Sequence, residues 1–302
     1  MKLLGKRVYA HLAIFGANLI YGINYSVAKE LMPDFISPFA FIFCRVIGAL
    51  ALFFLFGMIL KDKEKVAKKD FIRLAICGLF GVAANQLMFF YGLNLTSPIN
   101  AAIIMTSNPI LVMIFAALII RERITVTKLG GVFLGLAGAA ALILHGKNLS
   151  VENDGLIGDL FIFLNATSYA LYLVLVKPLM NKYQPLTVIK WVFFFGAFYV
   201  FPFGFNEFTQ VNWDAFTTNV WYAFAFVIVG TTFLAYLFNI YGLKRLNPTT
   251  VSSYIYSQPL IATTIALIFQ DGELNAVKVI AAILIFSGVY LVSIRKKKVA
   301  SA

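Results

Sequence analysis

The sequence predicts an all-α polytopic membrane protein in which ten transmembrane helices form two inverted five-helix repeats. Three observations lead to this prediction. Hydrophobic residues make up 61% of the chain and charged residues only 13%. Long apolar runs follow one another along the chain with short polar loops between them. The second half of the chain also repeats features of the first half at a spacing of 150 residues.

The composition excludes a soluble, a disordered or a fibrous protein. A soluble domain has about 45–50% apolar and about 25% charged residues, whereas this chain of 302 residues contains 31 phenylalanines and has a mean hydropathy of +0.87. The net charge of +12 does not indicate nucleic-acid binding, because basic residues of polytopic membrane proteins gather in cytoplasmic loops. Cys44 and Cys77 lie in apolar runs and are expected to be buried thiols.

The apolar runs predict ten spans, because each spanning helix needs roughly 20 apolar residues. The basic N-terminus resembles a signal peptide, but its apolar run extends to about Met32. That is longer than the roughly 7–15 apolar residues of a signal peptide, and no small-residue cleavage site follows, so we expect a retained first span. The predicted spans cover residues 8–32, 38–60, 71–94, 99–120, 128–145, 156–180, 185–205, 219–243, 249–269 and 276–294.

The basic residues predict the orientation of these spans. With the N-terminus in the cytoplasm and ten crossings, 21 of the 25 Lys and Arg residues fall on the cytoplasmic side. Lys29, Lys147 and Lys278 fall on the other side, and Arg45 lies within a span. The positive-inside rule therefore places both termini in the cytoplasm. The expected location is a bacterial inner membrane, although an organellar membrane would give the same pattern.

The two halves of the chain, residues 1–145 and 146–302, are similar to each other. Tyr91-Gly92-Leu93 aligns with Tyr241-Gly242-Leu243, and Pro109 aligns with Pro259, at a shift of 150 residues. Residues 71–144 contain 12 identities in 74 positions at this shift, so the coincident prolines and the shared spacing carry more weight than the identity. Because each repeat has an odd number of spans, the two copies must cross the membrane in opposite senses. Such inverted repeats are typical of transporters that work by alternating access.

Several short motifs strengthen this interpretation. They are Tyr21–Lys29 in the first span, Arg45 in the second, Tyr91-Gly92-Leu93, Asn108-Pro109, and Glu122–Thr125 before a Gly-rich fifth span. Together they resemble the EamA family of the drug/metabolite transporter superfamily over essentially the whole chain. The resemblance implies secondary transport, in the direction of export, of small metabolites such as amino acids through a cavity between the halves. Two departures weaken the internal symmetry. No basic residue in the second half matches Arg45, because Val192 lies at that place, and Glu273 lies one residue away from the position that matches Glu122 at a shift of 150.

Polar residues inside the spans are the candidate substrate-binding residues, since polar side chains in a bilayer normally face the protein interior or a wet cavity. Asn18, Tyr21 and Tyr25 share one helical face, as do Asn165, Ser168, Tyr169 and Tyr172. Hydrogen bonds between helices are the alternative role of these side chains. The predicted substrate-binding residues are Asn18, Tyr21, Asn85, Ser107, Asn108, Asn165, Tyr169, Tyr172, Tyr236, Asn239, Tyr256 and Gln258.

Two prolines and three basic residues complete the predicted site. Pro109 and Pro259 lie within spans at matching positions, where each removes a backbone donor and is expected to kink its helix as a bending point for gating. Lys29, Arg45 and Lys177 are the charges with a candidate functional role. Lys29 and Lys177 could instead extend to the membrane surface, and Arg45 could pair with Glu30 or a carbonyl.

Other functions are less well supported by the residues. A channel-like pore differs from a carrier only in its kinetics. An intramembrane enzyme is disfavoured because His11 and His145 lie far apart without a catalytic or metal-binding motif, so no catalytic residue, metal or cofactor is expected. The sequence contains no phosphate-binding loop, which disfavours an ATP-driven pump. The expected partners are a small-molecule substrate and the lipid bilayer, without nucleic acid. Gly131 and Gly135 could pack helices within a monomer or pair two chains in a homodimer.

Overall fold

The computed structural model describes residues 2–32, 34–96, 101, 104–144, 156–261, 264 and 276–294, and the regular structure of these residues is helical. The α-helices are α1 (Lys2–Leu31), α2 (Pro38–Ile59), α3 (Phe71–Gly78), α4 (Ala84–Leu95), α6 (Asn108–Ile120), α7 (Val126–Leu144), α8 (Leu156–Lys182), α9 (Pro185–Phe208), α10 (Thr218–Ala225), α11 (Ala235–Leu243), α12 (Pro248–Ser253) and α14 (Ala276–Ser293). Short segments of other helical geometry are η1 (Lys68–Asp70), η2 (Leu79–Ala83), η4 (Trp213–Ala215), η5 (Phe226–Leu234) and η6 (Tyr254–Tyr256).

The described helices overlap all ten predicted spans. Six are long and apolar enough to cross a membrane, namely Pro38–Ile59, Lys68–Leu95, Leu156–Lys182, Pro185–Phe208, Thr218–Leu243 and Ala276–Ser293. Asn108–Ile120 and Val126–Ala141 are shorter apolar helices. The all-helical class and the membrane-spanning character are therefore confirmed, whereas the count of ten spans stays a prediction.

Prolines start several of these helices. Pro38, Pro185 and Pro248 each occupy one of the first two positions of α2, α9 and α12. Proline is suited to this position because its missing N–H would have no partner in the first turn, and its fixed φ is already helical. The connections before α2, α9 and α12 are short, as the sequence predicted from these prolines.

Irregular helical geometry recurs at equivalent places in the two halves. The π-helical segment η2 interrupts the helix between Phe71 and Leu95, and the longer π-helical segment η5 interrupts the helix between Thr218 and Leu243. A turn at residues 106–107 precedes Pro109, and the 3-10 segment η6 precedes Ser257 and Pro259. Both correspondences fit the shift of 150 residues. Both interruptions precede the prolines: Pro109 occupies one of the first two positions of α6, and Pro259 follows η6, so bending at these prolines stays a prediction.

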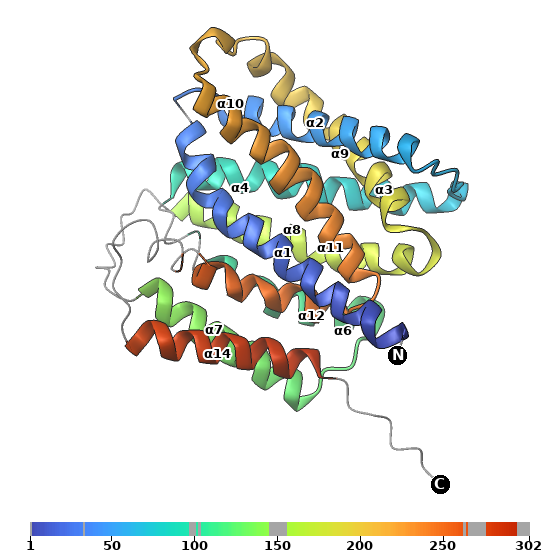
Figure 1. Ribbon diagram of the computed structural model, residues 1–302, viewed down its shortest axis with the longest axis vertical. Helices are drawn as coiled ribbons and strands as arrows, with labels where there is room; N and C mark the ends of the chain where they lie inside the picture. Colours follow the sequence, from blue (N-terminus) through green and yellow to red (C-terminus); the bar gives the residue numbers. More distant parts are fainter. Residues whose placement is uncertain are drawn as a thin grey trace.

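The closest helix pairs each join one half of the chain to the other. In Figure 1, α7 runs beside α14 at one side of the bundle and α2 lies with α9 at the opposite side. Between these pairs, α1 packs against α11, α4 against α8, and α6 against α12. The small residues in α7 serve the first of these contacts: a Cβ at Gly131 would meet the Gly288 carbonyl oxygen at 2.7 Å. The glycine pair predicted to pack helices thus does so within one chain.

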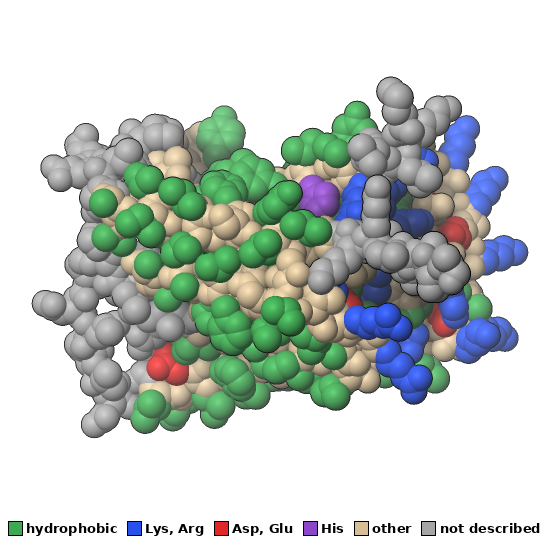
Figure 2. Space-filling model, turned by 90° about the horizontal axis from the view of Figure 1, so that it is seen from below, with side chains coloured by type: hydrophobic (Ala, Val, Ile, Leu, Met, Phe, Trp, Pro, Cys, Tyr) green, Lys and Arg blue, Asp and Glu red, His purple; other side chains and the backbone are tan. Residues whose placement is uncertain are grey.

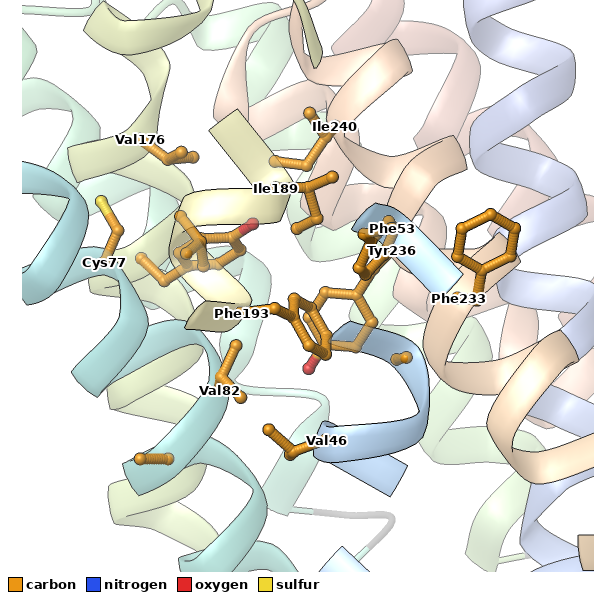
Figure 3. Close-up of a cluster of buried hydrophobic side chains, with 14 of the residues drawn as sticks. Val46, Phe53, Cys77, Val82, Val176, Ile189, Phe193, Phe233, Tyr236 and Ile240 are labelled. Carbon is orange, nitrogen blue, oxygen red and sulfur yellow. The ribbon is translucent and has the colours of Figure 1, made fainter. Parts of the chain in front are cut away.

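A large apolar core holds α2, α3, α8, α9, η5 and α11 together. Figure 3 shows Phe193 beside Tyr236, and their ring centroids lie 5.0 Å apart in an edge-to-face arrangement. Cys44 and Cys77 are buried free thiols. Outside this core, large apolar side chains such as Phe198 and Leu118 are each 74% exposed. Such an apolar exterior fits a hydrocarbon environment.

Charged side chains gather at one end of the bundle. Figure 2 shows Lys and Arg side chains at this end and an apolar surface over the middle of the molecule. The basic end carries the exposed Lys61, Lys65, Arg73 and Arg121. Its loops are joined by four residues, here called the loop clamp: Asp62, Asp70, Lys182 and Lys190. Lys190 Nζ lies 2.8 Å from Asp62 Oδ2, and Lys182 Nζ lies 3.0 Å from Asp70 Oδ1.

Candidate functional site: a polar cavity between the two halves

A cavity lies where helices of the two halves meet. Its volume is about 130 Å³, counted as the space open to the centres of water molecules. Helices α1, α2 and α4 of the first half face α8, α11 and α12 of the second half across it. The residues that line it are Asn18, Tyr21, Asn24, Ala28, Arg45, Asn85, Gln86, Phe89, Phe90, Leu93, Met105, Asn165, Tyr169, Leu173, Tyr236, Asn239, Val251, Ser252, Ile255 and Gln258.

Two hydrogen bonds donated by side-chain amides of the second half join the halves along α1. Gln258 Nε2 donates to Asn18 Oδ1 at 2.8 Å, and Asn18 Nδ2 in turn donates to the Ile14 carbonyl at 2.9 Å. Asn239 Nδ2 donates to the Tyr21 hydroxyl at 3.2 Å. These bonds bring α1 against both α11 and the helix that follows η6. A movement of one half against the other must therefore break or exchange them.

The π-helical segment η2 presents backbone acceptors to the second half. A π-helical turn holds one residue more than an α-helical turn, which alters the pairing of nearby carbonyl groups. Ser168 Oγ donates to the Phe80 carbonyl at 2.7 Å, and the Tyr236 hydroxyl donates to the Gly81 carbonyl at 3.2 Å. Just beyond η2, Asn165 Nδ2 donates to the Asn85 carbonyl at 2.5 Å. The irregular helix thus positions three polar residues of the other half beside the cavity.

Arg45 supplies the only formal charge among the described residues that line the cavity. The residue is 4% exposed, and its Nε donates to Thr232 Oγ1 at 3.0 Å. Thr232 lies in η5, where its hydroxyl also donates to the Val227 carbonyl five residues earlier, at 2.8 Å. The guanidinium carbon lies 5.0 Å from the ring centroid of Phe90 and 5.4 Å from that of Phe41. A hydroxyl and two aromatic faces therefore hold this cation in place.

Eight of the predicted substrate-binding residues lie together on the cavity wall, and Arg45 joins them. The face predicted for α1 through Asn18 and Tyr21 points into the cavity. The face predicted for α8 does so through Asn165 and Tyr169. The eight residues are Asn18, Tyr21, Asn85, Asn165, Tyr169, Tyr236, Asn239 and Gln258.

Four predicted residues lie elsewhere, in contacts between helices. Tyr172 packs its ring over Gly81 and Tyr256 packs its ring over Gly135, each glycine leaving room for an aromatic side chain. Asn108 Nδ2 donates to the Ala166 carbonyl at 2.7 Å and so joins α6 to α8. The Ser107 hydroxyl is buried at the start of α6 without a hydrogen bond to the described residues. These four do not line the cavity with the others, and their role in binding stays a prediction.

The remaining predicted charges are placed differently from Arg45. Lys177 Nζ donates to the carbonyls of Leu243 and Leu246, the latter at 2.7 Å, so it satisfies the C-terminal end of α11. This contact differs from an extension to the membrane surface, and a functional role for Lys177 stays a prediction. The side chains of Lys29 and Glu30 lie outside the described residues, so the predicted pairing of Arg45 with Glu30 is not tested. The described partner of Arg45 is a hydroxyl rather than a carboxylate or carbonyl.

The predicted set of binding residues left out three polar residues of the wall, although they are polar residues within the predicted spans, and all of its apolar part. Asn24, Gln86 and Ser252 line the cavity. Gln86 adjoins the predicted Asn85, and Asn24 lies one helical turn from Tyr21, so position on the same helix could have identified both. The apolar lining, which includes Phe89, Phe90 and Leu173, carries no signal in a sequence where most residues of each span are apolar.

Comparison with known proteins gives the same pattern over both halves. The model of the EamA-like transporter family matches residues 8–144 and again residues 156–294. The uncharacterized transporter YyaM of Bacillus subtilis is 26% identical over 298 residues, which cover 95% of this chain and 94% of that protein. A WAT1-related protein of Arabidopsis thaliana is 24% identical over 325 residues, an alignment that covers 98% of this chain and 88% of that protein. One crystal structure of another protein superposes with a TM-score of 0.76 at 19% identity, over 93% of this chain and 95% of that chain, which shows the shared fold.

The helical bundle, its apolar exterior and its relatives define an integral membrane protein of the transporter class. The chain belongs to the EamA-like transporter family, whose model matches it twice in succession. The predicted resemblance to this family of drug/metabolite transporters is therefore confirmed.

Proposed function

We propose that the protein is a secondary transporter that exports small amphipathic metabolites, amino acids among them, by alternating access. The observation that carries this proposal is the polar cavity enclosed between the two halves. Its amide and phenol groups would bind the polar part of a substrate, and its aromatic and aliphatic wall would bind the apolar part. The hydrogen bonds that cross the cavity would be exchanged as the halves move.

The recurring interruptions and the pairing of helices across the halves support an architecture of ten spans in two inverted repeats. In such transporters the substrate site lies near the midplane, beside interrupted helices. Here the turn before Pro109 and the segment η6 before Pro259 would be the bending points. We also propose a bacterial inner membrane with both termini in the cytoplasm, which the basic end of the bundle supports. The assembly would be a monomer or a homodimer.

Flux measurements in proteoliposomes test the proposal. Radiolabelled amino acids would be screened with and without an imposed pH gradient, with protein-free liposomes as background. We expect saturable flux, and counterflow in which unlabelled substrate on one side drives accumulation of the labelled compound. A channel-like pore would give flux without counterflow. If no compound in the amino-acid panel moves, the substrate class in this proposal is wrong.

Cavity variants connect this flux to the site. Asn18→Ala and Tyr169→Ala each remove a cavity group, and losing a bond of about 1.4 kcal/mol lowers kcat/KM about tenfold. Thr167→Ala is the matched control, because Thr167 lies in α8 beside this face, its described hydrogen bond goes to the Phe163 carbonyl at 2.9 Å, and it is not among the cavity-lining residues. Equal flux in all three variants would contradict the proposed cavity.

A further inference from the structure

We infer that the substrate carries a carboxylate group that docks on Arg45, with its apolar body against the aromatic wall of the cavity. This inference rests on the proposed function and narrows its substrate class. The starting point is a charge that the described part of the protein leaves without a counter-ion. Arg45 is only 4% exposed and lines the cavity. No carboxylate of the described residues forms an ion pair with it.

A buried cation in a membrane protein is expensive, and such residues normally have an anionic or strongly polar partner. Thr232 accepts a bond from Nε only. The guanidinium group also has two terminal nitrogens, which match the two oxygens of a carboxylate in a fork-like arrangement. The rings of Phe41 and Phe90 favour a cation but leave these in-plane donors unused. Arg45 is therefore oriented by its neighbours and still able to bind an anion.

The other polar groups of the cavity are neutral, so they do not compete for Arg45. Gln86 is 3% exposed on the cavity wall, and its amide has the Tyr236 hydroxyl as a side-chain neighbour. Asn24 Oδ1 and Asn165 Oδ1 are buried acceptors without a described donor. Buried polar atoms without partners are rare in folded proteins. The oxygens of Asn24 and Asn165 lie on the wall of one cavity, where a polar ligand would satisfy them.

The remaining wall defines the rest of the ligand. Phe89, Phe90, Leu93, Met105 and Leu173 form an apolar surface beside Arg45 and Gln86. A second charged or strongly polar group that faced this surface would be desolvated without compensation, so such a group could be held only beside the asparagine oxygens. The chemistry therefore fits a monocarboxylate with an apolar or aromatic body, with or without an amino group that donates to the free asparagine oxygens.

Ligand binding to the purified full-length protein tests the inference separately from transport. Three compounds share one ring and differ in a single group: phenylacetate is anionic, phenylacetamide is neutral and phenethylamine is cationic. L-Phenylalanine tests the carboxylate together with an amino group. A ligand that binds the folded state raises the melting temperature in a concentration-dependent way. We expect phenylacetate, L-phenylalanine or both to raise it, and at least tenfold weaker binding of the amide and the amine.

Variants assign the effect to Arg45. In Arg45→Gln the affinity for the carboxylates should fall at least tenfold, to the level of phenylacetamide. Arg45→Lys keeps the charge without the fork geometry and should lose less. Because Arg45→Gln could disturb folding, Thr232→Val provides a second variant that leaves Arg45 in place but removes its described positioning bond. It should weaken carboxylate binding while binding of phenylacetamide stays unchanged, which a purely structural role for Thr232 would not produce.

Three results would overturn the inference: equal binding of phenylacetamide and phenylacetate, unchanged carboxylate binding in Arg45→Gln, or no binding of either carboxylate. None of these results would contradict the proposed transport function, because the flux screen and the counterflow measurement test that function with other solutes as well. Conversely, carboxylate binding that depends on Arg45 without flux of any bound compound would support the binding site and contradict the transport proposal. Glu30→Gln serves as a control, since carboxylate binding should not depend on an acid supplied by the protein.

Discussion

Asn18 and Asn108 are both buried asparagines within predicted spans, but they have different surroundings. Asn18 lines the cavity and accepts a bond from Gln258 across the two halves. Asn108 is 0% exposed and donates to the Ala166 backbone, away from the cavity wall. At the scale of single residues, the partner decides whether a polar side chain in a span serves packing or the cavity.

Asn108→Ala should therefore affect stability rather than substrate affinity. Interhelical hydrogen bonds in membrane proteins contribute about 0.6 kcal/mol on average, and the loss should lower the melting temperature of the detergent-purified protein. The KM of flux should stay within about twofold, whereas Tyr169→Ala, a change on the cavity wall, should raise it about tenfold. A raised KM with an unchanged melting temperature in Asn108→Ala would return this residue to the binding site.

The sequence predicts which helical faces carry polar residues, but not how far each face extends into the cavity. Residues 165, 168, 169 and 172 form one continuous face of α8. The structure divides that face: Tyr169 lines the cavity, whereas the Tyr172 ring fills the space beside Gly81. That division depends on a glycine almost a hundred positions away in the chain, and no local pattern near Tyr172 contains it.

At the scale of helices, α7 and α14 approach each other closely because their contact faces carry glycines. A Cβ on Gly288 would lie 2.5 Å from the Gly131 carbonyl oxygen and 2.6 Å from the Gly135 nitrogen. These are backbone atoms, which cannot turn aside as a flexible side chain could. The contact therefore tolerates no added methyl group without separating the helices.

Gly131→Ala should destabilise the protein by about 1–3 kcal/mol, the usual cost of overpacking a tight contact. The neighbouring Gly130→Ala is a matched control, since a Cβ there meets nothing within 4 Å. In a helix, replacing this half-buried glycine, which has open space around it, should be neutral or stabilising by up to about 1 kcal/mol. Melting temperatures of the two variants measure the difference. Equal values would show that the α7–α14 contact is looser than described.

The positions of the helices could be predicted from apolar runs and prolines, but their internal geometry only in part. Proline lacks an N–H group, so the interruptions near Pro109 and Pro259 have a cause that the sequence states directly. The π-helical segments η2 and η5 have no such marker. Their altered carbonyl pairing is compensated by Ser168 and Tyr236 for η2, and by Thr231 and Thr232 for η5. For η2 these partners come from the other half of the chain, so tertiary contacts decide where the helix departs from regular geometry.

At the scale of the whole molecule, the loop clamp joins the α2–α3 connection to the α8–α9 connection at the basic end. Asp62 Oδ2 accepts from Lys190 Nζ at 2.8 Å, and both Asp62 oxygens lie near the Thr187 hydroxyl. The Tyr183 hydroxyl donates to Asp70 Oδ2 at 2.7 Å. These contacts close one end of the bundle between the two halves. Burial raises the pKa of the Asp62 carboxyl. The hydrogen bonds from Lys190 and its neighbours lower the pKa by more than burial raises it, so the pKa lies below its ordinary value of 3.8.

The loop clamp should make stability fall in acid. Because the folded-state pKa of Asp62 is below its unfolded value, its contribution is present above about pH 4 and is lost as the pH falls through the lowered pKa. At neutral pH, Asp62→Asn should cost about 1 kcal/mol, the upper end for ion pairs near water. The difference in melting temperature from the wild type should shrink below about pH 4. Asp214→Asn, at an exposed site in η4, is the control, and a profile identical to that of Asp62→Asn would exclude the loop clamp as the cause.

The proposed alternating access of the cavity is tested most directly by thiol labelling in sealed vesicles. In a Cys44→Ala, Cys77→Ala background, Tyr21→Cys places a thiol on the cavity wall and Lys65→Cys places one in the basic loop after α2. With a membrane-impermeant thiol reagent, we expect Lys65→Cys to react from the cytoplasmic side alone and Tyr21→Cys to react from either side, more slowly when a transported substrate is bound. Labelling of Tyr21→Cys from neither side, or from one side under every condition, would contradict a cavity that opens alternately to the two faces of the membrane.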